Sequence, residues 1–209
     1  MSEKKQGKRL FNLIAPVYGL FYKSQKKHYA KVIDEVGNIL DLTEFRTVVD
    51  VGCGTGALCS VLNEKGMEVT GLDPASRMLE VARSKAGNKG VNFVQADVLE
   101  RLPFEDKSFD ISIASYVAHG LDSHERQQMY AEMSRVAREW VIIHDYNDKR
   151  SPFVSFVEWL EGGDYFHFIK NAEAEMKDCL TELEECFSQV DVVSVGARAN
   201  WYIGKPAGG

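Results

Sequence analysis

The stretch Thr47-Val48-Val49-Asp50-Val51-Gly52-Cys53-Gly54-Thr55-Gly56 decides the fold of this chain. Its first half is apolar and β-branched, which is typical of a strand covered on both faces. Its second half places a glycine at every second position, at Gly52, Gly54 and Gly56. Glycine tolerates positive φ angles and lets the backbone approach a ligand closely. The stretch therefore predicts a buried strand that ends in a glycine-rich turn.

A helix is predicted directly after this turn, over about residues 56–65, because apolar residues recur there at helical spacing. The N–H groups at the start of such a helix, and its positive dipole end, point back at the turn. That arrangement favours a ligand that carries a nucleotide or a carboxylate. The glycine pattern alone is equally compatible with a tight strand-to-helix turn that binds nothing.

The bulk composition is that of a globular protein with one sizeable core. The chain has 209 residues, of which 44% are hydrophobic and 27% are charged, and its formal net charge is −6. This length suffices for one α/β core and is too short for two. The acidic balance disfavours a nucleic-acid partner. No apolar run approaches the length of a membrane span or of a signal-peptide core, so we expect a cytoplasmic protein without membrane insertion.

The four cysteines do not follow a metal-binding pattern. Cys53, Cys59, Cys179 and Cys186 include no CxxC pair, and no histidine lies at zinc-finger spacing from them. We therefore predict no metal site, and we interpret Cys53 and Cys59 as reduced, buried thiols.

Residues 1–45 are predicted to form an N-terminal helical extension that serves as a lid. Residues 9–22 are too apolar for a mobile tail, and residues 26–40 place their apolar side chains on one helical face. Pro16 is expected to break or open a helix within the first of these segments.

From residue 46 onward, strand and helix patterns alternate, which predicts a mostly parallel sheet with helices on both faces. The predicted strands cover residues 47–51, 68–73, 91–97, 109–114, 140–145, 190–195 and 201–203. The linker between the last two is too short for a parallel crossover, so these strands must form an antiparallel hairpin. Residues 146–171 interrupt the alternation and are rich in aromatic side chains, whereas residues 172–187 are predicted to be a helix.

Acidic side chains lie at the ends of three consecutive predicted strands. Ligands bind beyond the carboxyl ends of the strands in open α/β sheets, and Asp50, Asp73 and Asp97 are placed there. Asp73 is suited to accept both hydroxyls of a ribose, Asp97 could accept from an adenine amine, and Asp50 could fix the turn or reach an ammonium group. Asp73 and Asp97 each also fit a turn-capping role. Three acids at three strand ends together favour a ligand.

These residues resemble the class I S-adenosylmethionine-dependent methyltransferases. The likeness rests on the run 49–56, on Gly71-Leu72-Asp73, on Ala96-Asp97 and on Phe109-Asp110, and it covers roughly residues 10–145. Residues 13–18 are also similar to the Ala-Pro-x-Tyr segment of the ubiquinone/menaquinone-type branch. The resemblance implies a three-layer, Rossmann-like α/β fold with seven strands, mostly parallel, in which the last strand lies antiparallel between strands 5 and 6.

The resemblance also implies S-adenosyl-L-methionine as the cofactor. The glycines of the turn would lie under its methionine part, Asp73 would hold the ribose, and Asp97 would bind the adenine. Tyr18, and with it Tyr22, would close over the cofactor. The full set of implied cofactor-binding residues is Tyr18, Asp50, Gly52, Gly54, Gly56, Asp73, Asp97, Val98 and Ser115. Many relatives carry Pro-Gly-Gly before strand 5, where this chain has Arg138-Glu139, which leaves the subfamily open.

The implied reaction is methyl transfer to a small, partly apolar molecule. It depends mainly on aligning the two reactants in a dry pocket, and it needs a base only where the acceptor must lose a proton. His119, His144 and His167 are candidate bases, and His119 is preferred because it follows strand 4. The aromatic residues of 146–171 are expected to line the acceptor pocket as a second lid segment. A Pro-Pro-aromatic turn, typical of enzymes that methylate DNA amines, is absent after strand 4.

Two alternative functions stay open on the residues alone. A nicotinamide-dependent oxidoreductase would also use a glycine turn and Asp73, but its pyrophosphate site prefers GxGxxG, whereas this turn reads GxGxG. Asp97 and the final hairpin would then stay unexplained. A catalytically silent S-adenosylmethionine-binding protein is the second alternative, because methyl transfer has no obligatory catalytic residue.

Overall fold

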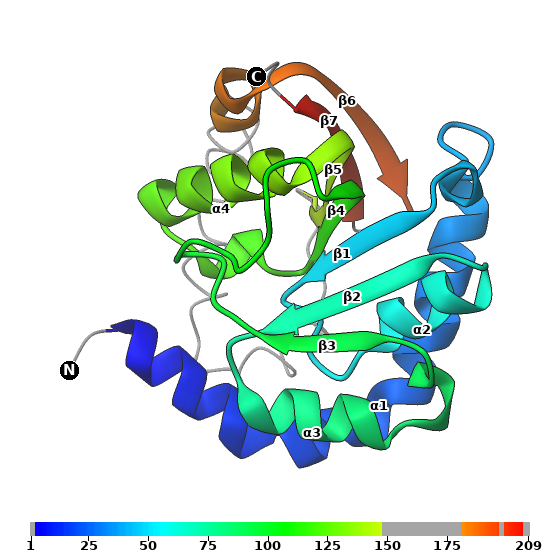
Figure 1. Cartoon of the computed structure of the whole chain (residues 1–209), viewed down its shortest axis with the longest axis vertical. Helices are drawn as coiled ribbons and strands as arrows, with labels where there is room; N and C mark the ends of the chain where they lie inside the picture. The colour runs from blue at the N-terminus through cyan, green and yellow to red at the C-terminus, as the bar shows by residue number, and fades with distance from the viewer. Residues whose placement is uncertain (1–2, 148–180, 197–198, 207–209) are drawn as a thin grey trace. The chain divides into compact units, whose positions relative to one another are not determined.

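The structure is a computed structural model that describes residues 3–147, 181–196 and 199–206 (Figure 1). The chain divides into two compact units, Met1–Pro103 and Phe104–Gly209. The strand order is β3-β2-β1 in the first unit and β4-β5-β7-β6 in the second, which gives the seven-stranded order β3-β2-β1-β4-β5-β7-β6. The predicted seven strands, and their α/β class, are thus confirmed.

The first unit holds three parallel strands. β1 (Thr47–Val51) pairs with β2 (Glu68–Asp73), and β2 pairs with β3 (Asn92–Gln95). Every residue of β1 after Thr47 and every residue of β2 after Glu68 is buried, as expected for strands covered on both faces. The register sets Asp50 opposite Gly71. The carboxyl ends of β1 and β2 therefore bring Asp50 and Asp73 into one neighbourhood.

Two helices and one short 3₁₀ turn connect these strands, and a second 3₁₀ turn precedes β1. α2 (Ala57–Glu64) follows the glycine turn, α3 (Ser76–Ser84) follows β2, and η1 (Leu42–Glu44) and η2 (Ala86–Asn88) are the short turns. The residues of α2 from Ala57 to Leu62 are all buried. α2 is enclosed because it contacts β2 on one side and the N-terminal helix on the other.

The N-terminal helix α1 (Glu3–Val36) runs through Pro16, so the prediction that this proline breaks or opens the helix is wrong. Two features explain the continuity. Pro16 is exposed, so water can solvate the carbonyl group that its missing N–H leaves without a donor. The preceding residue, Ala15, is fully buried against Ala75 and Met78 at the start of α3. Packing against α3 overrides the local preference of the proline.

Asn12 of α1 supplies the cap that α3 lacks. The N-cap residue of α3, Ala75, has no side chain that could bond the first N–H groups of the helix. The Asn12 side-chain oxygen instead accepts from the Arg77 N–H at 2.9 Å. An orphan donor at a helix start is thus satisfied from another helix, which fixes α1 to α3.

The second unit combines one parallel and two antiparallel strand pairs. β4 (Phe109–Ser115) lies parallel to β5 (Ala137–Tyr146), whereas β7 (Ala199–Pro206) is antiparallel to both β5 and β6 (Phe187–Val195). The predicted final hairpin, with the last strand between strands 5 and 6, is confirmed. β5 begins three residues earlier than predicted, because Ala137 already pairs with Phe109.

The helix α4 (Ser123–Val136) covers these strands and begins with a capping box. The Asp122 side chain accepts from the Glu125 N–H at 2.8 Å, and the Glu125 side chain reaches back to the Asp122 N–H, as a capping box requires. Arg126 forms a buried two-bond ion pair with Glu182 at 2.8 and 3.1 Å. The 3₁₀ turn η3 (Ala118–Gly120) lies between β4 and α4.

Two sequence expectations concern residues around 146–187. The aromatic insertion lies outside the described residues from 148 on, together with His167 and the first part of the predicted helix 172–187. Residues 181–186 are helical, but Phe187 is the first residue of β6 rather than the last of the helix. Phe187 is nevertheless buried, as predicted, because it packs against Tyr130 of α4.

Candidate functional site

The glycine turn after β1 has the conformation that its sequence predicts. Gly52, Gly54 and Gly56 have φ angles of 69°, 52° and 74°, a region that side chains rarely tolerate. A Cβ on Gly56 would lie 2.5 Å from Asn88 Nδ2 and 2.9 Å from Phe93 Cζ. A Cβ on Gly54 would meet no atom of the described chain within 4 Å. The protein itself fills the space beside Gly56, whereas the space beside Gly54 is open to a ligand.

Asp73 holds this turn in place. Its Oδ2 accepts from the Gly54 N–H at 3.0 Å, and its Oδ1 accepts from the Ala75 N–H at 2.8 Å. Burial raises the pKa of Asp73 to about 6, even though these two hydrogen bonds favour the ionised form. The carboxylate predicted to bind a ribose therefore also joins the end of β2 to the glycine turn and to the start of α3.

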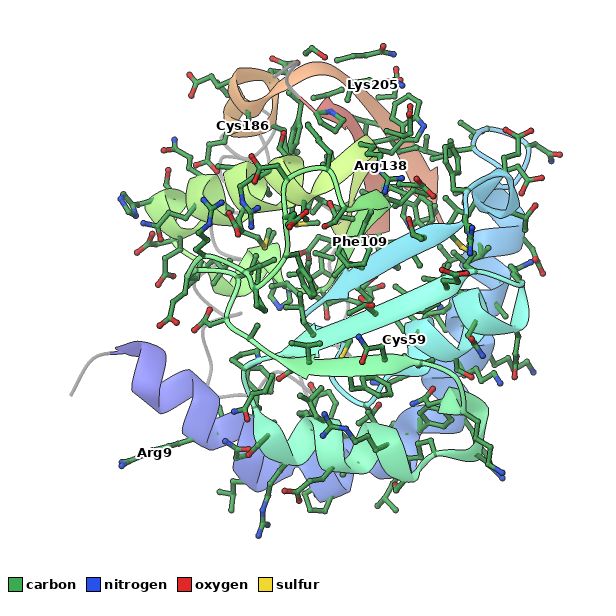
Figure 2. The ribbon with its side chains drawn as sticks, viewed as in Figure 1. Arg9, Cys59, Phe109, Arg138, Cys186 and Lys205 are labelled. Atoms are coloured by element: carbon green, nitrogen blue, oxygen red, sulfur yellow. The ribbon has the colours of Figure 1, made fainter. Side chains whose placement is uncertain are left out.

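Asp50 lies beneath the same turn and is almost fully buried. Its Oδ2 accepts from the Cys59 thiol at 3.1 Å, and burial raises its pKa to about 7, with a further contribution from the charge of Asp73. Cys53 and Cys59 would both lie within 3 Å of a Cβ on Gly71, so this glycine makes room for the two sulfurs (Cys59 is labelled in Figure 2). A thiol that donates a hydrogen bond is a reduced one, in agreement with the interpretation of these cysteines.

Two buried carboxylates lie next to the glycine turn, and their charged forms are penalised. Burial is the main reason why the pKa values of Asp50 and Asp73 are raised; the charge of Asp73 adds to the shift of Asp50, and the charge of Asp97 adds to the shift of Asp73. A bound cation would remove this penalty, because opposite charge at short range favours the ionised carboxylate. The arrangement therefore suits a ligand with a positively charged group near the turn.

Asp97 caps a turn beyond β3. Its Oδ1 accepts from the Leu99 N–H at 3.0 Å, and its carbonyl oxygen accepts from the Glu100 N–H. This is the turn-capping role that its sequence also allowed. The neighbouring Val98 is buried. Asp97 interacts electrostatically with Asp73, so the structure brings the acids of the second and third strand ends into one electrostatic neighbourhood.

A buried hydrogen-bond chain connects α1 to the glycine turn. The Tyr22 hydroxyl donates to Asn88 Oδ1 at 3.1 Å, and Asn88 Nδ2 donates to the carbonyl oxygens of Thr55 and Ala82 at 3.2 and 2.8 Å. Tyr18 lies one turn earlier on α1 and packs against the Ala15–Ala75–Met78 cluster at the start of α3. The N-terminal extension is thus hydrogen-bonded, through Asn88, to the Thr55 carbonyl group in the glycine turn.

In the second unit, the ends of β4 and β5 place Ser115, Tyr116 and His144 together. Ser115 Oγ lies 3.3 Å from His144 Nδ1, and the Tyr116 N–H donates to the His144 carbonyl oxygen at 2.8 Å. Tyr116 has a φ angle of 56°, which is unusual for a bulky residue. Strained backbone of this kind gathers at functional sites, and here it directs the chain from β4 into η3.

His119 and Asp145 form a hydrogen-bonded pair in this unit. His119 Nδ1 lies 2.9 Å from Asp145 Oδ1, and the His119 N–H donates to Asp145 Oδ2 at 3.2 Å. Burial alone would raise the pKa of Asp145, but the charge of His119 and three hydrogen bonds outweigh this effect and lower the pKa. When the His119 ring is neutral, an ionised Asp145 that accepts from Nδ1–H leaves the lone pair of the imidazole on Nε2. The pair therefore has the geometry of an oriented general base.

Aromatic rings surround this pair. Tyr146 lies 4.9 Å from the His119 ring and 4.8 Å from Tyr116, and Tyr116 lies 4.7 Å from His144, measured between ring centroids. Burial and the charge of Asp145 raise the pKa of Tyr116, so this residue stays a neutral phenol. These closely spaced aromatic rings give a largely apolar surface beside the His119 imidazole.

The predicted site residues thus fall into two groups. Tyr18, Asp50, the three glycines, Asp73, Asp97 and Val98 belong to the first unit, and Ser115 and His119 belong to the second. Within the described residues, no group of three or more His, Cys, Asp or Glu side chains is arranged to hold a metal ion. Asp145 ends the predicted strand 140–145, but the sequence carries no signal for its bond to His119, because 26 residues separate the two. The sequence also contains no indication that Asn88, which lies in a turn, links α1 to the glycine turn by hydrogen bonds.

Comparison with known proteins finds methyltransferases among the relatives of this chain. Residues 48–139 match the family described as "Methyltransferase domain". The chain is 30% identical over 155 residues to the ubiquinone/menaquinone biosynthesis C-methyltransferase UbiE of Campylobacter jejuni, which covers 66% of this chain and 62% of that protein. It is 34% identical over 142 residues to the demethylmenaquinone methyltransferase of Thermotoga maritima. This match covers 65% of this chain and 58% of that protein. The chain thus spans about three fifths of the length of these curated relatives.

Solved structures show the same fold. A Methanococcus maripaludis protein assigned as an S-adenosyl-L-methionine-dependent methyltransferase superposes with a TM-score of 0.71 over 95% of this chain and 94% of its own, at 19% identity. The CurJ carbon methyltransferase superposes with a TM-score of 0.62 over 84% of this chain and 52% of its own, at 17% identity. The nicotinamide-dependent alternative receives no support from these comparisons. With its glycine turn and three strand-end acids, the chain resembles the class I S-adenosylmethionine-dependent methyltransferases, and among them the ubiquinone/menaquinone-type members.

Proposed function

We propose that this chain transfers a methyl group from S-adenosyl-L-methionine to a small, partly apolar molecule. The observation that carries the proposal is the pairing of Gly54 with Asp73. Gly54 presents an open backbone at positive φ, and its N–H is held by a buried carboxylate that a cation would stabilise. The family match and the names of the relatives support the same activity.

The first unit is proposed to bind the cofactor, and its residues fit that ligand. S-adenosylmethionine supplies an activated methyl group on a positively charged sulfur. We assign the methionine part to Gly52, Gly54 and Gly56, the ribose to Asp73, and the adenine to Asp97 and Val98. Asp50 stabilises the turn through Cys59 and adds negative charge beneath it. Tyr18, and the N-terminal extension of residues 1–45 as a whole, are proposed to cover the bound cofactor.

The second unit is proposed to serve the acceptor. His119 would accept a proton from the acceptor where the attacked atom carries one, and Asp145 would hold the ring in the required tautomer. Ser115, hydrogen-bonded near His144, is proposed to contact the cofactor from this unit. The apolar ring surface of Tyr116 and Tyr146 suits a planar or partly apolar acceptor. The names of two relatives, a ubiquinone/menaquinone biosynthesis C-methyltransferase and a demethylmenaquinone methyltransferase, support this proposal.

A cytoplasmic location is part of the proposal. The Cys59 thiol donates a hydrogen bond to Asp50 and lies next to Cys53. Two thiols that stay reduced at such short range suit a reducing compartment. We also propose that the acceptor is not a nucleic acid, in keeping with a net charge of −6.

The experiment that tests the proposal has two parts. Calorimetric titration measures binding of S-adenosylmethionine, of its demethylated product and of NADH to the full chain. Activity is then measured against a panel of phenols, quinols, amines, carboxylates and thiols. Binding of the sulfonium cofactor together with turnover of one class supports the proposal. Binding without any turnover would favour a catalytically silent cofactor-binding protein, and binding of NADH alone would contradict the proposal.

A further inference from the structure

α1 presents two different faces along its length. One face is buried, and its residues Ala15, Tyr22, Val32, Ile33 and Val36 belong to the core. The opposite face carries large apolar side chains that are exposed: Leu13 by 75%, Val17 by 45%, Leu20 by 81% and Phe21 by 50%. Their spacing of four, three and one residues puts them on one side of a helix. We call these four residues the outer stripe.

An apolar stripe of this size on a single surface helix is informative. Isolated exposed apolar residues need no explanation, but contiguous ones mark a surface that binds something. The outer stripe is not needed for the fold, because α1 is already attached through its other face. Asn12, Ala15 and Tyr22 make that attachment to α3 and to the glycine turn region.

The charge of α1 indicates what the stripe binds. Between Glu3 and Asp34 the sequence has no acidic residue, but it has eight basic ones, in a chain whose net charge is −6. Two of them form ion pairs within the chain: Lys26 pairs with Glu64, and Lys31 lies 3.4 Å from Glu35. The other six precede or follow the stripe: Lys4, Lys5, Lys8, Arg9, Lys23 and Lys27. Figure 2 shows Arg9 extending outward from the helix.

We propose that the outer stripe of α1 is a docking surface for an anionic lipid bilayer. The helix lies in the plane of the interface, with the stripe at the boundary between headgroups and acyl chains and with Lys23 and Lys27 against lipid phosphates. A basic amphipathic helix with exposed Leu and Phe binds membranes in this way. The helix does not enter the bilayer further: none of the described helices combines the length and the apolar character that crossing it would require.

Charge and shape favour a bilayer over the other occupants of such a face. A symmetric contact between two copies of α1 would bring two helices without intervening acidic residues against each other, at a cost in like-charge repulsion. A protein groove could reach only one side of α1, because the other side is packed on α2 and α3. A planar, negatively charged surface contacts one side only and matches the sign of the charge.

The test is cosedimentation of the full chain with vesicles, and it requires no enzymatic activity. The vesicles are either pure phosphatidylcholine or phosphatidylcholine with a quarter of phosphatidylglycerol. We expect binding to the anionic vesicles to be at least about tenfold stronger than to the neutral ones, and to weaken with added salt. The double variant Leu13→Ser/Leu20→Ser should lose about tenfold or more of that binding. The matched control is Ile39→Ser, which removes another exposed apolar side chain (61%) outside the stripe.

A charge variant separates the electrostatic contribution to vesicle binding from the contribution of the apolar stripe. Lys23→Glu/Lys27→Glu should weaken binding to anionic vesicles about tenfold, whereas Lys89→Glu/Arg101→Glu should leave it unchanged. Unaltered circular dichroism and cofactor affinity verify that each variant is folded. Wild-type protein that stays in the supernatant with anionic vesicles would overturn the proposal. So would equal sedimentation of the stripe variant and the Ile39 control, or a dimer in light scattering that only the stripe variant loses.

Discussion

The Asp73 carboxylate accepts a hydrogen bond from the Gly54 backbone N–H at 3.0 Å. This bond joins the end of β2 to the glycine turn after β1, and the second oxygen of Asp73 bonds the Ala75 N–H at the start of α3. One side chain thus positions the turn and is proposed to receive the ribose of the cofactor. The first role affects the stability of the protein and the second affects its affinity for the cofactor, and the two can be measured separately.

Replacing Asp73 should weaken both stability and cofactor binding. Asp73→Ala removes two backbone hydrogen bonds and the proposed ribose contacts, and we expect a loss of about 1–3 kcal/mol in cofactor binding. Calorimetry measures the affinity, and denaturant unfolding measures the stability. The control is Asp41→Ala, because Asp41 also bonds a backbone N–H, that of Thr43, but lies outside the site. Unchanged affinity in Asp73→Ala would contradict the assignment of the ribose.

Cofactor affinity should fall as the pH is lowered from 7 to 5. The pKa values of Asp73 and Asp50 are raised to about 6 and about 7, so both carboxylates become protonated in this range and stop attracting a cation. Because binding and protonation are linked, we expect the affinity to drop about tenfold or more. Asp73→Asn should flatten this dependence, and a wild-type affinity independent of pH would count against a cationic ligand.

The stability of the unliganded protein should change in the opposite direction. Both carboxyl groups have folded-state pKa values above the ordinary value of 3.8, so the folded protein holds their protons more tightly than the unfolded chain. Their contribution to stability is complete below pH 4 and is lost as the pH rises through about 6 and 7. Thermal unfolding of wild type and Asp73→Asn between pH 5 and 8 measures this: wild type should lose more stability with rising pH than the variant does.

His119 and Asp145 should affect turnover rather than cofactor binding. Asp145→Asn removes the acceptor that orients His119, and we expect kcat to fall about a hundredfold with an acceptor that must lose a proton. The pH profile of kcat should move as well, which a purely structural role would not cause. His124→Gln on the exposed face of α4 is the control. Equal kcat in wild type and Asp145→Asn would exclude the pair from proton transfer.

Asn88 should couple α1 to the glycine turn. Asn88→Ala leaves the Thr55 and Ala82 carbonyl groups and the Tyr22 hydroxyl without their partner, and we expect a loss of about 1–3 kcal/mol in unfolding free energy. Asn63→Ala, which removes a more exposed bond to Lys89, should cost less. If both variants unfold alike, the chain from Tyr22 to the turn does not stabilise the protein.

Local patterns predicted most of this structure, and long-range contacts account for what they missed. Strand 68–73, the turn glycines and the closing hairpin follow from periodicity and linker length, which act within a few residues. Pro16 was misread because the packing of Ala15 on α3 comes from residues about 60 positions away. The bonds of Asn12 to Arg77 and of His119 to Asp145 also join residues far apart in sequence, by 65 and 26 positions. A single sequence carries no signal for such pairs.

The central claim is that a cofactor binds against the open backbone of Gly54, and one pair of variants tests it directly. Gly54 and Gly66 both have positive φ, and a Cβ on either would meet no atom of the described chain within 4 Å. An alanine at either position costs roughly 1–2 kcal/mol of backbone strain. Calorimetric titration with S-adenosylmethionine should show that Gly66→Ala binds like the wild type, whereas Gly54→Ala loses at least about tenfold in affinity. Equal affinity of the two variants would contradict the account.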